Sequence, residues 1–99
     1  MTPFTEKVIN IIRDIPEGKV MTYGQVARLA GNPRAARQVS RILHSMSKKY
    51  HLPWHRVINA KGHVVIKEDD AYHAQILNLQ MEGIDVDHRG KINLEKYQA

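Results

Sequence analysis

The sequence predicts a mainly α, winged-helix-like domain with a helix-turn-helix and a small β-hairpin. Apolar residues recur at helical spacing in several segments, a Gly-Asn-Pro turn joins two of these segments, and two short β-branched runs flank a loop that contains glycine. We expect the 99 residues to form a single domain with a core over about residues 4–83. Residues 84–99 are polar with isolated apolar side chains, and they are expected to form a loose C-terminal extension.

Two capping signals predict the first helices. Thr2 before Pro3 is a favourable helix start, because the hydroxyl accepts from a free backbone amide and proline fits the first helical position. The apolar stripe that follows ends before Pro16. Thr22 is expected to cap a second helix, which Gly31 closes.

A third helix is expected to begin at Asn32-Pro33 and to run to about Ser47. Asparagine followed by proline repeats the start signal, and apolar residues continue at helical spacing after it. Because only a tight turn separates this segment from the second helix, the pair indicates a helix-turn-helix.

Later segments predict a hairpin and a last helix. Val57–Ile58 and Val64–Ile66 flank a glycine-containing loop, which is typical of a β-hairpin. Asp69 or Asp70 is expected to cap a last helix, which ends before Gly83.

Composition narrows the class of function. The net charge of +5 favours a polyanionic partner such as nucleic acid. The chain has no cysteine, which excludes disulfides, cysteine-based zinc sites and cysteine nucleophiles. The six histidines show no helical metal-binding spacing, so we expect no metal and no cofactor. No apolar run suits a membrane span or a secretory signal, and we expect a cytoplasmic protein that does not bind membranes and joins the nucleoid when bound to DNA.

The third helix is expected to present a basic face. Arg34, Arg37, Arg41 and His44 share one side of a helix with 3.6 residues per turn. Ala35 is small enough to let the backbone come close to DNA. A merely solvated charged face is the alternative, but such a face usually mixes signs, and no acidic residue interrupts this stretch. The pattern therefore favours insertion of this helix into a DNA groove.

Three ordered motifs then indicate a family. Residues 22–27 read Thr-Tyr-Gly-Gln-Val-Ala, residues 31–39 read Gly-Asn-Pro-Arg-Ala-Ala-Arg-Gln-Val, and residues 53–58 read Pro-Trp-His-Arg-Val-Ile. Together they resemble the DNA-binding domain of the O6-alkylguanine-DNA alkyltransferases, whose third motif has cysteine where this chain has Trp54. Tryptophan at that position resembles the non-enzymatic branch, the alkyltransferase-like proteins. The match covers roughly residues 4–83.

The resemblance implies roles in DNA binding. Tyr23 corresponds to the tyrosine that presses on the phosphate 3′ to the target and helps to rotate the nucleotide outward. Arg37 corresponds to the arginine that enters the base stack and fills the vacated space. The alternative for Tyr23 is a half-buried core aromatic with a satisfied hydroxyl. The predicted DNA-binding residues are Tyr23, Arg34, Ala35, Arg37 and Arg41.

The resemblance also implies a lesion pocket without chemistry. Indole cannot replace the thiolate nucleophile, so no residue is expected to be catalytic and the chain is not expected to be an enzyme. His55 and Glu82 match the residues that activate the family's cysteine, and we expect them to remain as scaffold, hydrogen-bonded near the pocket floor. Trp54 is expected to line the pocket beside the alkyl group, the alternative being that it fills the core. The predicted pocket consists of Tyr23, Trp54, His55, Arg56, Val57, Lys67 and Glu82.

One segment differs from the alkyltransferases. These enzymes have a Tyr-Ser-Gly-Gly-like segment that closes over the base, whereas this chain has Ile66-Lys67-Glu68-Asp69-Asp70. A different lid predicts a less restrictive pocket that admits bulkier alkyl groups. Lys67 is expected either to contact the damaged base or a phosphate, or to be an ordinary surface lysine.

The expected function is recognition of O6-alkylguanine in double-stranded DNA. The base would be flipped and held without repair, and the lesion flagged for nucleotide excision repair proteins by a monomer. A DNA hydrolase or glycosylase that uses His55 and Glu82 as an acid–base pair is one alternative. A winged-helix transcription regulator that binds an undamaged sequence is the other.

Overall fold

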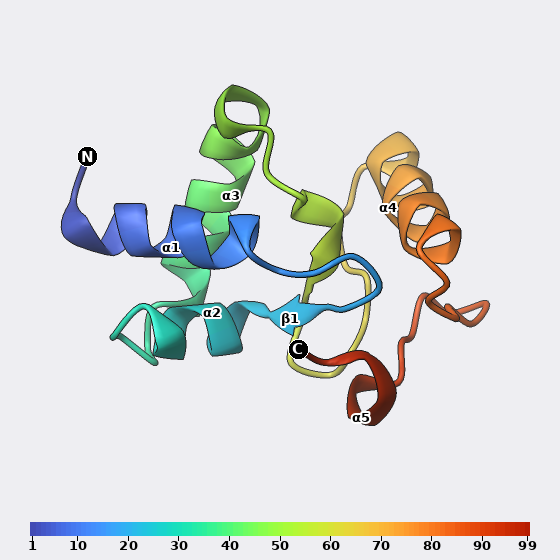
Figure 1. Cartoon of the computed structure of the whole chain (residues 1–99). Coiled ribbons are helices and arrows are strands. Elements are labelled where there is room, and N and C mark those ends of the chain that lie inside the picture. The colour runs from blue at the N-terminus through green and yellow to red at the C-terminus, as the bar shows by residue number, and fades with distance from the viewer.

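The computed structural model describes residues 1–99, in which helices surround a very small sheet (Figure 1). The prediction of a mainly helical fold with a helix-turn-helix, formed by α2 and α3, is confirmed. No helix has the length and apolar character needed to span a bilayer. The elements are α1 (Pro3–Arg13), β1 (Met21–Thr22), α2 (Tyr23–Leu29), α3 (Ala36–Tyr50), the 3-10 turn η1 (Trp54–Arg56), β2 (Val57–Ile58), α4 (Asp69–Met81) and α5 (Leu94–Tyr97).

The predicted caps of α1 and α2 are present. Thr2 Oγ1 accepts from the backbone amide of Thr5 at 3.2 Å, and Thr22 Oγ1 accepts from that of Gln25 at 3.0 Å. Gly31, which follows α2, has a φ of 99°, a conformation that glycine adopts without strain. The local signals therefore define the first two helices correctly.

Helix α3 begins and ends later than predicted. Asn32 does not cap the helix, because its Oδ1 accepts from the amide of Arg34 and closes a local turn. The first helical residue is Ala36, and no side chain caps that end. At the other end, His51 adopts a left-handed conformation with a φ of 53° and terminates the helix.

The predicted hairpin is wrong. Strand β2 pairs in parallel with β1, with Met21 opposite Val57 and Thr22 opposite Ile58. Residues 64–66 form no strand. Val57 and Ile58 are both 1% exposed, and a strand buried on both faces pairs inside the molecule rather than in an exposed hairpin.

Two hydrophobic clusters meet at β2. Val57 belongs to the cluster between α1, α2 and α3, whereas the adjacent Ile58 belongs to a second cluster that includes Leu79 of α4. Successive residues of a strand point to opposite faces, so this two-residue strand contributes to both clusters. Strand β2 thereby connects the helix-turn-helix to α4.

Residues 84–99 are an integral part of the second cluster. Ile84 and Ile92 are each 1% exposed and Tyr97 is 8% exposed. These residues therefore do not form the loose extension that the sequence predicted. Their apolar side chains are too widely spaced to produce a periodic signal, because a short irregular segment contributes one buried residue at a time.

Candidate nucleic-acid interface

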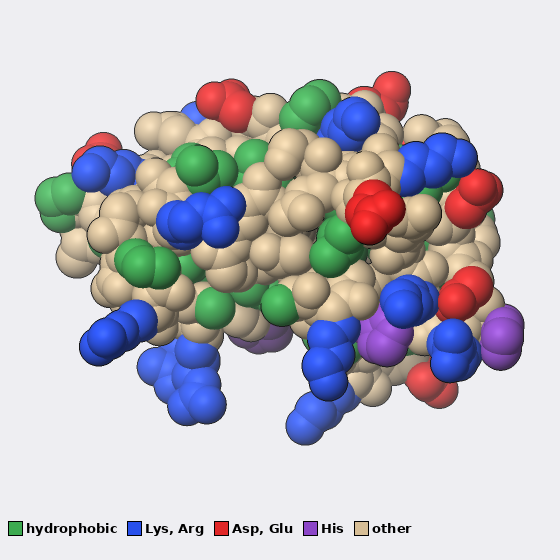
Figure 2. Space-filling model, turned by 90° about the horizontal axis from the view of Figure 1, so that it is seen from below, with side chains coloured by type: hydrophobic (Ala, Val, Ile, Leu, Met, Phe, Trp, Pro, Cys, Tyr) green, Lys and Arg blue, Asp and Glu red, His purple; other side chains and the backbone are tan.

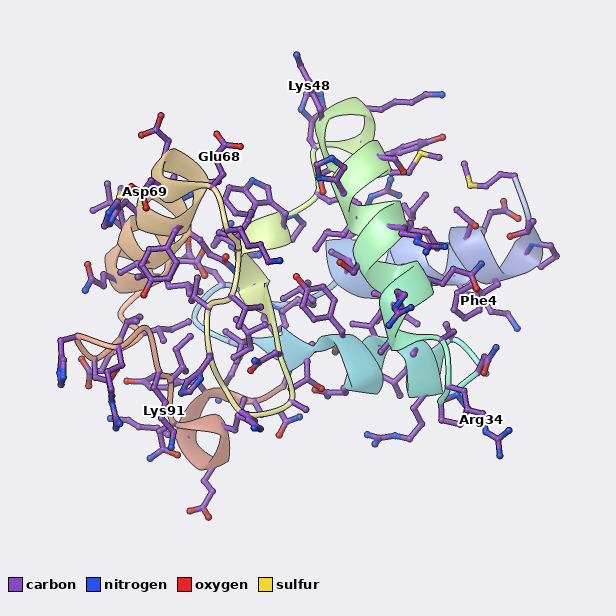
Figure 3. The ribbon with its side chains drawn as sticks, turned by 180° about the vertical axis from the view of Figure 1, so that it is seen from behind. Phe4, Arg34, Lys48, Glu68, Asp69 and Lys91 are labelled. Atoms are coloured by element: carbon purple, nitrogen blue, oxygen red, sulfur yellow. The ribbon has the colours of Figure 1, made fainter.

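A cleft of about 780 Å³ opens between α3 and the segment that leads into α4. Its volume is within the usual range of small-ligand pockets, about 300–1,000 Å³. Figure 3 shows Lys48, near the end of α3, and Glu68, at the start of α4, on the two sides of this opening. The cleft is lined by Tyr23, Ser40, Leu43, His44, Ser47, Lys48, His51, Leu52, Trp54, Val65, Ile66, Glu68, Ala71 and Gln75.

Tyr23 and Trp54 supply the aromatic part of the cleft lining. Both side chains are half-buried and pack against the first cluster. Burial raises the pKa of the Tyr23 hydroxyl above its ordinary value, so this group remains a neutral hydrogen-bond donor at physiological pH. The Trp54 indole meets the His55 ring edge-to-face, with centroids 6.3 Å apart. Two aromatic side chains, Tyr23 and Trp54, therefore border the cleft.

Two apolar side chains form the rim of the cleft. Val65 is 50% exposed and Ile66 is 38% exposed, although most side chains of this type are buried in the fold. Both lie in the segment between β2 and α4 and line the cleft. The cleft is therefore apolar at the rim and at Trp54, which suits a base that carries an alkyl group.

His55, Arg56 and Glu82 form a closed cluster that does not line the cleft. His55 Nε2 donates to Glu82 Oε2 at 2.5 Å, so the predicted hydrogen bond is present. Arg56 Nη2 donates to Glu82 Oε2 at 2.8 Å, and Arg56 Nε donates to Oε1 at 2.9 Å. The backbone amide of Gly18 also donates to Oε1 at 2.9 Å, and Arg56 Nη1 donates to the carbonyl of Ile15 at 2.8 Å. No buried side-chain nitrogen or oxygen of the cluster lacks a hydrogen-bond partner, as is typical of a structural site.

These contacts determine the charge of Glu82. Burial alone would raise the pKa of its carboxyl group, but hydrogen bonds from Arg56, from the Gly18 amide and from His55 lower it to about 2. The group is thus ionised at every physiological pH. A carboxylate of such low basicity is a poor acceptor for a proton in catalysis.

Gln75 connects α4 to the motif that contains Trp54. Its Nε2 donates to the carbonyls of His55 and Val57, each at 3.1 Å, and the residue is 4% exposed. This residue was not predicted from the sequence. Its only signal is a glutamine on the apolar face of a helix, and nothing in that pattern shows which backbone it meets.

The basic face of α3 continues into the cleft. Arg37 and Arg41 are exposed on α3, and Arg34 is exposed before its first turn. His44 and Lys48 extend the same side of the helix and line the cleft. Figure 3 shows Arg34 and Lys48 near opposite ends of this face.

Charge is strongly segregated along the chain. Residues 18–67 contain ten Lys and Arg and no Asp or Glu, so all ten acidic residues lie outside this segment. Figure 2 shows Lys and Arg side chains projecting from the lower edge of the molecule in that view. The basic face of α3 next to an aromatic cleft is an arrangement suited to a DNA backbone with one base displaced from the stack.

The structure places other predicted residues away from the cleft. Val57 is in the core rather than in the pocket, because β2 is buried on both faces. Lys67 is exposed between two lining residues but does not line the cleft itself. Ala35 is 7% exposed and packs in the first cluster, so its side chain faces the core.

His44 was predicted as part of the basic face, but Ser40, Ser47 and His51 were not predicted from the sequence to line the cleft. Ser40, His44, Ser47 and His51 follow one another at intervals of four, three and four residues. This spacing puts residues on one side of a helix, and it would have extended the basic face toward the cleft.

Comparisons with known proteins agree with this geometry. Residues 3–84 match the family model described as "6-O-methylguanine DNA methyltransferase, DNA binding domain". The chain is 44% identical over 95 residues to the "DNA base-flipping protein" of Escherichia coli, covering 96% of this chain and 73% of that protein. It is 37% identical over 102 residues to "Alkyltransferase-like protein 1" of Schizosaccharomyces pombe, covering 98% of this chain and 94% of that protein.

A solved structure is similar over the whole chain. The crystal structure of S. pombe Atl1 in complex with damaged DNA containing O6-carboxymethylguanine superposes with a TM-score of 0.89 at 36% sequence identity. The match covers 100% of this chain and 96% of the other. The fold described above is therefore one that has been seen bound to damaged DNA.

Proposed function

Since this chain belongs to the alkyltransferase-like branch of the family described by the 6-O-methylguanine DNA methyltransferase DNA-binding domain, we propose that it is a lesion-binding protein. It binds duplex DNA at an O6-alkylated guanine and holds the damaged base, rotated out of the helix, in the cleft beside Trp54. The resemblance predicted from three motifs is thus confirmed at the level of the family. The chain has no cysteine, so it lacks the nucleophile of alkyl transfer.

The observation that supports this function is the continuity between the basic face of α3 and the aromatic cleft. Arginine side chains neutralise phosphates and give affinity for any duplex. Arg37 enters the base stack and occupies the space that the rotated guanine leaves, because a planar guanidinium both stacks and donates hydrogen bonds. Tyr23 contacts the backbone at the displaced nucleotide, and Trp54 offers a face to the base.

Selectivity for the alkylated base follows from the free-energy cost of rotating a base out of the helix. Extruding a base costs a few kcal/mol, and the cost is smallest for a base that is already poorly paired. An O6-alkyl group removes the hydrogen bond at that oxygen and adds apolar surface, which Val65 and Ile66 are placed to cover. Both effects favour the alkylated base over guanine.

The enzyme alternative is not favoured by the closed cluster. Its proposed base, Glu82, accepts from Arg56, Gly18 and His55, and its pKa of about 2 makes it a weak proton acceptor. His55 and Glu82 also lie outside the cleft lining. The arrangement supports a scaffold that positions the Trp54 motif.

Binding without chemistry requires a later step by other proteins. We propose that one copy of the protein, acting as a monomer in the cytoplasm, marks the lesion for nucleotide excision repair. A stable complex around a displaced base is a distortion that a general damage sensor recognises, and slow dissociation gives that sensor time to act.

A binding titration tests the proposed function. Two fluorescently labelled duplexes that differ only at one guanine are titrated with the protein at a fixed salt concentration, since affinity depends on salt. We expect at least about tenfold tighter binding to the duplex with O6-methylguanine, a difference of about 1.4 kcal/mol. Equal affinity for both duplexes would show that the protein does not recognise this lesion.

A further inference from the structure

Gln25, on α2, is held by the last residues of the chain through both atoms of its side-chain amide. Its Nε2 donates to the backbone oxygen of Ala99 at 2.7 Å, and its Oε1 accepts from Gln98 Nε2 at 2.8 Å. Gln25 is only 9% exposed. Loss of either partner would leave a buried polar atom unsatisfied, which is costly. The start of α2 is therefore fixed to a segment more than 70 residues away in the sequence.

The backbone makes a second connection between the same two segments. The amide of Val20 donates to the carbonyl of Tyr97 at 2.9 Å, and the amide of Ala99 donates to the carbonyl of Val20 at 2.8 Å. Val20 and Gln98 thus form a parallel bridge, and Figure 1 shows the C-terminus beside β1. Strand β1 pairs with β2. The segment that leads into α2 is therefore paired twice: Val20 pairs with the terminal segment, and β1 pairs with β2.

The terminal segment is itself well anchored. Asn93 caps α5, and Tyr97 is buried in the second cluster. The Tyr97 hydroxyl accepts from the backbone amide of Asp85 at 3.2 Å and donates to its Oδ2 at 3.3 Å. Because the terminal segment is fixed in this way, it can hold α2 in position.

Tyr23 is the residue on which such support would act. It is the first residue of α2, directly after β1, and it lines the cleft. Helix α2 has only seven residues, and so short a helix has little stability of its own. Its orientation must therefore come from the contacts that flank it, and Gln25 lies two residues after Tyr23.

We propose that Gln25 and Gln98 are positioning residues for Tyr23, and that the bridge from the terminal segment to α2 holds this tyrosine against the DNA backbone while the base rotates. The inference rests on the proposed function, because Tyr23 needs this support only if it contacts DNA at a displaced nucleotide. The bridge then favours the complex with a rotated base and has little effect on binding to an undamaged duplex.

The test is a double-mutant cycle between Gln25 and Tyr23. Gln25→Leu keeps the approximate size of the side chain and removes both hydrogen bonds. We expect affinity for the O6-methylguanine duplex to fall about tenfold and affinity for undamaged DNA to change by less than about twofold. In a Tyr23→Ala background, measured at low salt where binding remains strong, Gln25→Leu should cause no further loss beyond about twofold.

Two further variants separate positioning from simple stability. Ile92→Val removes one buried methylene from the second cluster without touching the bridge, and it should leave the affinity ratio between damaged and undamaged duplexes unchanged. Gln98→Ala changes an exposed residue and should lower this ratio in the same direction as Gln25→Leu, which provides a test if Gln25→Leu does not fold.

The outcomes distinguish this inference from the proposed function. An unchanged affinity ratio in both glutamine variants, or equal losses from Gln25→Leu in the presence and absence of Tyr23, would overturn the positioning role while lesion binding stands. A wild-type protein that binds both duplexes equally would instead overturn the proposed function.

Discussion

Two neighbouring parts of one short motif face different environments. Trp54 lines an open cleft, whereas the next two residues, His55 and Arg56, turn to a closed cluster around Glu82. The 3-10 turn formed by these three residues makes this divergence possible, because its successive side chains point in different directions. In the alkyltransferases, the resemblance implies that the residues matching His55 and Glu82 activate the cysteine that stands in place of Trp54. Here the cleft side is open, and the cluster side is a closed set of hydrogen bonds that supports the motif.

Several variants test the contrast between the open cleft and the closed cluster. The largest effect, a loss of folding stability, is expected from Glu82→Ala. It leaves Arg56 without its buried partner, and removing one partner of such a pair costs about 3 kcal/mol or more of unfolding free energy. Denaturation in urea measures this loss, with Glu95→Ala as the control at an exposed carboxylate. The fraction that remains folded should still prefer the O6-methylguanine duplex. Unchanged stability together with lost preference would place Glu82 in lesion binding.

Arg37→Ala is expected to weaken DNA binding and to leave stability almost unchanged. Its side chain is exposed and has no intramolecular partner among the hydrogen bonds and ion pairs, so stability should change by less than about 0.5 kcal/mol. Affinity for the damaged duplex should fall by about 1–3 kcal/mol. Titration of both duplexes measures this loss, and Arg89→Ala provides a control arginine outside the basic segment. If the Arg37→Ala variant binds the damaged duplex as tightly as the wild type, Arg37 does not enter the base stack.

A smaller effect on stability is expected on acidification, and Glu82 in the cluster contributes to it. The pKa of Glu82 is lowered to about 2 from an ordinary value of 4.5, so the ionised group stabilises the folded state. This stabilisation is complete above about pH 4.5 and is lost as the pH falls toward 2. Thermal unfolding of the wild type and of Glu82→Gln across this range should converge at low pH. Parallel curves would mean that Glu82 does not contribute to the acid sensitivity.

The smallest effect is expected from Arg41→Ala, on the exposed part of α3. If this side chain neutralises one phosphate, the slope of log affinity against log salt should decrease by about 1 for damaged and undamaged duplexes alike. Titrations at several salt concentrations give the slope. A change that appears only with the lesion would mean that Arg41 reads the displaced base rather than the backbone.

Part of this account could be predicted from the sequence because the relevant signals are local. Thr2 and Thr22 cap their helices as expected, since a cap depends on residues within one turn. The bond between His55 and Glu82 could be predicted only from the family resemblance. The pairing of Val57–Ile58 with β1 could not, because a short apolar run carries no information about which distant segment it meets.

The same limit explains why the support for α2 was missed. Gln25 lies within the motif at residues 22–27, but its partners are the side chain of Gln98 and the backbone oxygen of Ala99. Nothing in the pattern of a short polar segment indicates that it returns to an earlier strand. The residues proposed to contact DNA could be predicted from charge, periodicity and the family resemblance, whereas the residues proposed to hold them in place are found from tertiary contacts.

The displaced base is proposed to lie in the cleft against Trp54, and the intrinsic fluorescence of the protein tests this placement. Trp54 is the only tryptophan in the chain, so its emission reports on this site without labelling. We expect quenching that saturates with one O6-methylguanine duplex per protein and is much weaker with the undamaged duplex, because a stacked base quenches indole. Unchanged emission at saturating concentrations of the damaged duplex would contradict the claim and place the base elsewhere.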